Sequence, residues 1–139
     1  MTQELWLNLP VKNIAQSVAF FTALGFEFNT KFGGDASQMA CMLVGRKKVV
    51  IMLCAEPLFK NLVQHDLANT QTASQLLISI DAESRAEVNE LAVKVVSAGG
   101  TIFAQPHENQ GWMYGMGFAD LDGHRWNVLY MDSPKMQGK

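Results

Sequence analysis

The stretch LPVKNIAQSVAFFTALGF, residues 9–26, predicts the junction between a β-strand and the α-helix that follows it. Apolar residues occupy every second position from 5 to 11, which is typical of a strand with one buried face. Asn13 is a favourable N-cap, because its side-chain oxygen can accept from a free amide of the first helical turn. Apolar residues then recur at helical spacing from 14 to 21, and Gly25 provides the left-handed residue that ends many helices.

The same order of elements is predicted a second time further along the chain. Ser84 and Glu87 form a capping box at the start of a second helix, and Gly99 follows its last apolar turn. The predicted strands cover residues 4–11, 26–32, 37–44 and 47–54 in the first half, and 75–80, 101–106, 112–120 and 125–131 in the second. Elements match at an offset of roughly seventy residues, for example Gly25 with Gly99, which favours an internal duplication.

The repeat predicts one α+β domain over residues 1–139. Module one covers about residues 3–55, module two covers about residues 74–132, and a linker of about residues 56–73 joins them. Apolar residues in the first part of the linker recur at helical spacing, which predicts one short helix followed by a polar loop. The sequence therefore predicts two βαβββ modules within a single domain.

Composition places the chain among ordinary globular proteins. Of its 139 residues 48% are hydrophobic and 17% are charged, and the formal net charge is −2. Without a basic surface or a charge run, neither nucleic acid nor a membrane is expected as a partner. No segment approaches the roughly 18 apolar residues needed to span a bilayer. Cys41 and Cys54 have neither metal-pair spacing nor the density of a disulfide framework, so we expect a reduced, cytoplasmic protein.

Two segments resemble the vicinal oxygen chelate superfamily, which contains glyoxalase I, extradiol dioxygenases and bleomycin- and fosfomycin-resistance proteins. Residues 9–26 look like its opening segment, and residues 118–132, FADLDGHRWNVLYMD, resemble its closing segment with an Asp-Gly-His/Asn turn before the last strand. The resemblance implies that each module forms a strongly curved, mostly antiparallel sheet. It also implies that two modules line an apolar cavity, either within one chain or across a homodimer.

The resemblance further implies where a metal ion would be held. Enzymes of the family bind a divalent ion through His or Glu on the first and last strands of each module, and those positions fall here on Trp6, Met52, Gln75 and Asn127. Tryptophan has only an N–H donor, a thioether suits soft ions, and neutral amides usually bind hard ions beside carboxylates. A shift of two residues along the same faces adds Cys54 as the one good ligand. We therefore expect no cofactor, with a divalent metal as the less favoured alternative.

The residues expected to line the cavity are mostly aromatic, sulfur-containing or amide side chains, which is typical of a small-molecule pocket. They are Trp6, Asn8, Met52, Cys54, Gln75, Tyr114, Arg125 and Asn127. Strand parity leaves open whether Tyr114 points inward. Asn8, Gln75 and Asn127 need polar partners, which can be a ligand or one another. Arg125 is the candidate for binding an anionic group on a ligand.

Three functions are compatible with these features. The preferred one is a small-molecule-binding protein without a metal ion, similar to the bleomycin-resistance members. The second is a lyase or dioxygenase of the same superfamily with a non-standard site, for which His107 and Glu108, expected in a loop, are the catalytic candidates. The third is a dimeric scaffold without a ligand. A small molecule and a second copy of the chain are thus the expected partners.

Overall fold

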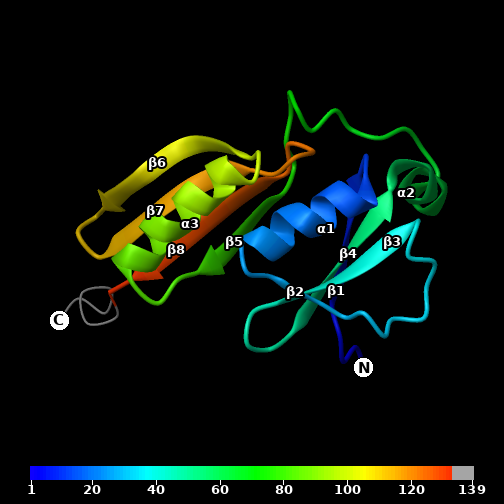
Figure 1. Cartoon of the computed structure of the whole chain (residues 1–139), viewed down its shortest axis with the longest axis horizontal. Coiled ribbons are helices and arrows are strands. Elements are labelled where there is room, and N and C mark those ends of the chain that lie inside the picture. The colour runs from blue at the N-terminus through cyan, green and yellow to red at the C-terminus, as the bar shows by residue number, and fades with distance from the viewer. Residues whose placement is uncertain (133–139) are drawn as a thin grey trace. The chain divides into compact units, whose positions relative to one another are not determined.

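A computed structural model describes residues 1–132, which form eight strands and three helices (Figure 1). These residues divide into two compact units, with the boundary between Ala68 and Asn69. Each unit contains one open, four-stranded sheet. Over residues 1–132, the helices are all too short or too polar to cross a membrane.

The first unit contains one βαβββ repeat and an additional short helix. Its elements are β1 (Trp6–Val11), α1 (Ile14–Ala23), β2 (Glu27–Phe28), β3 (Met39–Val44), β4 (Val49–Ala55) and α2 (Glu56–Val63). The strands lie in the order β1-β4-β3-β2, with β1 parallel to β4 and the other pairs antiparallel. The helix α2 is the one predicted after the first module. Pro57 lies in its first turn, where backbone N–H groups have no partner within the helix, so the N–H that proline lacks is not needed.

The second unit repeats this topology. Its elements are β5 (Leu77–Asp81), α3 (Arg85–Ser97), β6 (Thr101–Asn109), β7 (Met113–Ala119) and β8 (Arg125–Met131). The strands lie in the order β5-β8-β7-β6, and only β5 and β8 pair in parallel. The predicted α+β class with two βαβββ modules and mostly antiparallel sheets is confirmed.

The helices of both units begin and end in the same way. Asn13 caps α1 by accepting from a backbone N–H three residues later at 2.9 Å, and Ser84 caps α3 in the same manner at 3.0 Å. Gly25 and Gly99 follow the helices with φ of 99° and 101°, a conformation that a side chain would disfavour. The four residues singled out as helix boundaries in the sequence therefore act as predicted.

Each unit buries a pair of aromatic rings in contact. In the first unit Phe20 and Phe21 of α1 meet edge to face, with ring centroids 5.1 Å apart. In the second unit Phe118 of β7 stacks on Trp126 of β8 at 5.8 Å, and both side chains are fully buried. Burying a side chain of this kind contributes about 1.5–3 kcal/mol to the free energy of folding.

A buried carboxylate organises the turn between β7 and β8. Asp120 is 7% exposed and accepts hydrogen bonds from the backbone N–H groups of Asp122 and His124, each at 3.0 Å. Its other oxygen accepts from the Trp126 indole N–H at 3.1 Å. Burial raises the pKa of Asp120 above its ordinary value, although nearby His124 and the three donors act in the opposite direction. The Asp120 carboxylate therefore ties this turn to the aromatic core.

Most strands differ by one or two residues from their predicted bounds, and the second and sixth differ by more. The second strand is only two residues long, whereas residues 26–32 were predicted. The fifth begins at Leu77 instead of Gln75. The sixth continues to Asn109, past Pro106, because β6 is an edge strand whose register shifts between Ala104 and His107, and such positions tolerate a missing backbone donor.

Candidate functional site

Each sheet has one face packed against a helix and one face directed away from it. In the first sheet Leu9, Met42 and Ile51 are at most 4% exposed and share the face that packs against α1. Because side chains alternate along a strand, Asn8 and Met52 lie on the other face. We call the faces away from α1 and α3 the first and second distal faces.

The first distal face brings together four residues predicted from the sequence: Trp6, Asn8, Met52 and Cys54. Asn8 pairs directly with Met52, and its side-chain oxygen accepts a weak hydrogen bond from the Cys54 thiol at 3.8 Å. Trp6 is 65% exposed at the start of β1. Burial raises the pKa of the Cys54 thiol, and that of Cys41 on the neighbouring strand, so both stay protonated at neutral pH. This face presents neutral and soft atoms.

The second distal face carries Arg125 and Asn127, as the strand parity predicted. Across β5 and β8, Ser79 pairs with Asn127 and Leu77 pairs with Arg125, so the four residues form a two-by-two patch. The Arg125 guanidinium carbon lies 4.5 Å from the centre of the Phe103 ring, a distance at which a cation is attracted to an aromatic face. Ser79 is exposed, and Arg125 and Asn127 are half-buried.

The Phe103 ring reaches Arg125 across Gly117, a residue without a side chain on the strand between them. Thr101 pairs with Ala119, which pairs with Arg125, so alternation along β6 places Phe103 on the same face as Arg125. Gly117 of β7 then leaves room for the ring, since a Cβ at that position would overlap it. Phe103 was not among the predicted site residues, because residue types along β6 do not show which side chains of β8 it approaches. The one available signal was the unusual glycine pair Gly115 and Gly117 in a buried strand.

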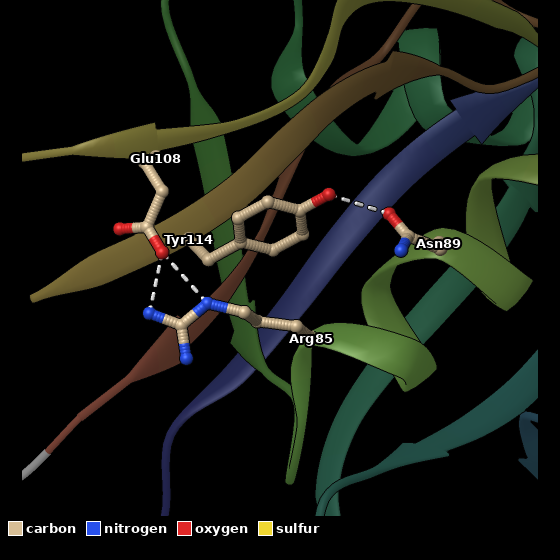
Figure 2. A network of polar contacts seen from close by, with 4 residues as sticks. All are labelled: Arg85, Asn89, Glu108 and Tyr114. Carbon is tan, nitrogen blue, oxygen red and sulfur yellow. Dashed lines mark hydrogen bonds and ion pairs between the residues drawn. The ribbon is translucent and has the colours of Figure 1, made fainter.

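Tyr114 lies on the opposite face from Asn127. Its hydroxyl donates to the Asn89 side chain of α3 at 2.7 Å, which places it on the helix-packed face (Figure 2). The Arg85 guanidinium lies over the Tyr114 ring and donates to Glu108 through Nε at 2.7 Å. The prediction that Tyr114 lines the same site as Asn127 is therefore wrong, because β7 pairs with β8 in a register that puts Gly117, not Tyr114, beside Asn127.

His107 and Glu108 do not form a shared acid/base pair. They are consecutive residues of β6 rather than loop residues, so their side chains point to opposite faces of the sheet. Glu108 is held by Arg85, and this interaction raises the pKa of the guanidinium (Figure 2). The Nδ1 atom of His107 lies 2.7 Å from the Gln105 carbonyl oxygen. The arrangement gives these two residues no common substrate position.

The strand register revises one of the positions implied for a metal ligand. Asn8 and Ser79 stand five residues before the caps Asn13 and Ser84, and they pair with Met52 and Asn127 respectively. Trp6 therefore corresponds to Leu77 in β5. The earlier match of Trp6 with Gln75 is wrong, because Gln75 precedes the strand.

The side chains at these strand positions do not fit a hard divalent ion. The first distal face offers an amide, a thioether and a buried protonated thiol, and the second offers a hydroxyl, an amide and a guanidinium. Asp81 and His107 also belong to the second distal face, but they lie on its opposite edge strands, roughly 14 Å apart by the spacing of strands. No group of three His, Cys, Asp or Glu residues capable of holding a metal ion occurs among residues 1–132.

A separate cavity of about 240 Å³ lies within the first unit. It is partly open and lies between α1, the end of β2, the loop that follows and β3, and its lining includes Val18, Phe28, Phe32, Met39 and Cys41. None of the residues predicted to bind a ligand lines it. The sequence did not indicate this cavity, because it depends on the path of the loop between β2 and β3.

The paired βαβββ repeats define a fold class that known structures share. A hypothetical protein from S. aureus is 33% identical over 94% of this chain and 95% of its own, with a TM-score of 0.83. A glyoxalase/bleomycin resistance protein/dioxygenase family enzyme from Burkholderia phytofirmans has a TM-score of 0.75 at 17% identity over 91% of this chain and 96% of its own. A fosfomycin resistance protein from Listeria monocytogenes has a TM-score of 0.67 at 17% identity over 94% and 91%.

The sequence comparison agrees with the fold. The family model described as bleomycin resistance protein-like N-terminal matches residues 3–45, which contain β1, α1, β2 and most of β3. None of the curated proteins compared with the chain matches it. The fold and the match to the family model agree with the resemblance of the sequence to the vicinal oxygen chelate superfamily, the group of glyoxalase, bleomycin-resistance and dioxygenase-like proteins.

Proposed function

We propose that this protein binds a small organic molecule and does so without a metal ion. The observation that carries the proposal is the chemistry of the two distal faces. At the strand positions where family enzymes hold a metal, this chain has Trp6, Met52, Leu77 and Asn127. Without a carboxylate or a neutral imidazole among them, a hard dication would lose more hydration energy than these groups return.

Polar groups without protein partners also support ligand binding. Ser79 and Asn127 pair with each other across β5 and β8, and neither side chain makes a hydrogen bond or ion pair with another residue in the part of the chain that the structure describes. Apolar and aromatic side chains surround them, including Leu77 and Phe103, which are 50% and 42% exposed. Exposed apolar area beside unpaired polar groups is the usual composition of a small-molecule site.

The relatives suggest which compounds to test first. One match is to a family described as bleomycin resistance protein-like, and one structural neighbour is described as a fosfomycin resistance protein. The chemistry of the distal faces favours binding of a compound over its chemical alteration, because they supply recognition groups and no assembled acid/base pair.

The test is a ligand titration monitored by tryptophan fluorescence. Protein dialysed against a chelator is titrated with bleomycin, fosfomycin and a panel of neutral and charged aromatic compounds. We expect a saturable change with at least one compound, and the same affinity before and after chelation. Trp6→Phe identifies the signal from the first distal face. Failure of the whole panel, or a signal that needs added metal, contradicts the proposal.

A further inference from the structure

We propose that the ligand of this protein carries a carboxylate or a similar small anionic group, bound by Arg125 on its Phe103 platform. This inference rests on the proposed function and adds the chemical class of the ligand. Three features of the second distal face support it: the Arg125 guanidinium has no ion-pair partner among the residues that the structure describes, the Phe103 ring holds it in place, and polar groups lie at a fixed spacing from it.

The Arg125 guanidinium is available to a ligand. It makes a cation–aromatic contact with the Phe103 ring. No hydrogen bond or ion pair joins it to another side chain within residues 1–132. The other guanidinium of this unit shows the contrast, because Arg85 is neutralised by Glu108. Asp81, the carboxylate of β5 on the same face, pairs with Leu129, four residues along β8 from Arg125, a separation of roughly 13 Å. Arg125 therefore keeps its full charge and its five N–H donors.

The Phe103 ring fixes the orientation of that charge. With its central carbon over the ring, the guanidinium is held on one side, and its N–H groups form the fork that matches two carboxylate oxygens. Gly117 makes this contact possible, because any side chain there would displace the ring. Lysine at position 125 would supply charge without the fork, so it is predicted to replace Arg125 only in part.

The spacing of neighbouring groups suggests the shape of the ligand. Asn127 lies two residues from Arg125 on β8, roughly 7 Å along the strand, and Ser79 lies directly opposite Asn127. Leu77 and the Phe103 ring border the patch with apolar surface. A ligand with an anionic group at one end, a small apolar body and a hydrogen-bonding group at the other end would satisfy all of these residues.

The test compares pairs of probes that differ only in charge. The probes are benzoate with benzamide and 4-hydroxybenzoate with 4-hydroxybenzamide, titrated into chelator-treated protein by calorimetry and by NMR. We expect each carboxylate to bind about tenfold more tightly than its amide, as one charge-assisted interaction allows. We also expect the difference to shrink as salt is raised.

Variants connect the preference to the residues. Arg125→Met should remove the carboxylate preference, Arg125→Lys should keep part of it, and Phe103→Leu should weaken it through loss of orientation. Arg46→Met removes the same charge from an exposed turn of the first unit and serves as the matched control. Circular dichroism checks that each variant is folded. If Arg125→Met does not fold, the two single variants Arg125→Lys and Phe103→Leu decide the test.

The outcomes separate this inference from the proposed function. Equal binding of acid and amide, or a carboxylate preference that survives Arg125→Met, overturns the inference and leaves metal-free binding intact. Carboxylates that bind no more tightly than about 10 mM also overturn it. If other compounds of the panel bind only after metal is added, the proposed function fails as well.

Discussion

The two units share one topology but differ in what their distal faces offer. The first distal face is neutral, with two buried protonated thiols and an amide beside methionine. The second carries an unpaired guanidinium, an amide and a hydroxyl around an aromatic ring. The helix caps and the closing glycines are nearly the same in both units. The difference teaches that the repeated topology fixes the framework, whereas the chemistry of each face is set by a few strand positions.

The largest effect expected from this contrast concerns the thiols, which occur only in the first unit. Cys41 is 5% exposed and Cys54 has no exposed surface, and burial raises the pKa of both. Modification by a disulfide reagent at neutral pH should therefore be at least about a hundredfold slower in the native protein than in denaturant. Timed absorbance measurements with single-cysteine variants check this. Rapid reaction of Cys54 in native protein would mean that the first distal face is not packed as described.

The next effect concerns the turn between β7 and β8 of the second unit, which the buried Asp120 stabilises. Asp120→Ala leaves three buried N–H donors without an acceptor and should lower the free energy of unfolding by about 3 kcal/mol. The corresponding turn of the first unit closes through a backbone hydrogen bond from Lys48 to Gly45. Arg46→Ala in that turn is the control and should change little. Urea denaturation measures both variants, and equal effects would contradict the assigned role of Asp120.

A smaller effect follows from the raised pKa of Asp120. An acid whose pKa is raised on folding stabilises the native state below its ordinary value of 3.8, and this contribution is lost as the pH rises through the raised pKa. Relative to Asp120→Asn, the wild type should therefore gain stability as the pH falls from neutral towards 3.8. Unfolding curves of both proteins across this range test the sign. A relative loss of wild-type stability on acidification would show that the hydrogen bonds outweigh burial.

The smallest effect is expected for the ion pair between Arg85 and Glu108. Their side chains are 36% and 48% exposed, so solvent and salt screen the interaction. Glu108→Gln should shift the thermal midpoint only slightly, and the shift should disappear in high salt. Tyr114→Phe, which breaks the bond to Asn89, is the comparison for the rest of the network. A large, salt-independent loss would show that the network supports the fold more strongly than its exposure suggests.

The sequence predicted the framework well because the framework depends on local signals. Asn13, Ser84, Gly25 and Gly99 act through their own backbone conformations and short-range hydrogen bonds, which the residue types reveal. The repeat order followed from them, and the family resemblance agreed.

The candidate site was only partly predictable, because it depends on strand register. Alternation placed Trp6, Asn8, Arg125 and Asn127 on the correct faces, but it could not show that β5 begins after Gln75. Tyr114 was misplaced for the same reason, since its direction depends on how β7 pairs with β8.

The contribution of Phe103 was only weakly indicated by the sequence. Its approach to Arg125 depends on the absence of a side chain at Gly117, on the strand between them. This is a property of neighbouring strands together, and the glycine pair in β7 was the one signal of it.

The most direct test of metal-free binding is the metal content of the protein itself. Cells are grown with added manganese, iron, nickel and zinc, and the protein is purified without chelators and analysed by mass spectrometry for metal per chain. The account predicts far less than stoichiometric metal, with unchanged ligand affinity. The contradicting result is a stoichiometric ion in the wild type, with loss of both the ion and ligand binding in a Met52→Ala or Asn127→Ala variant.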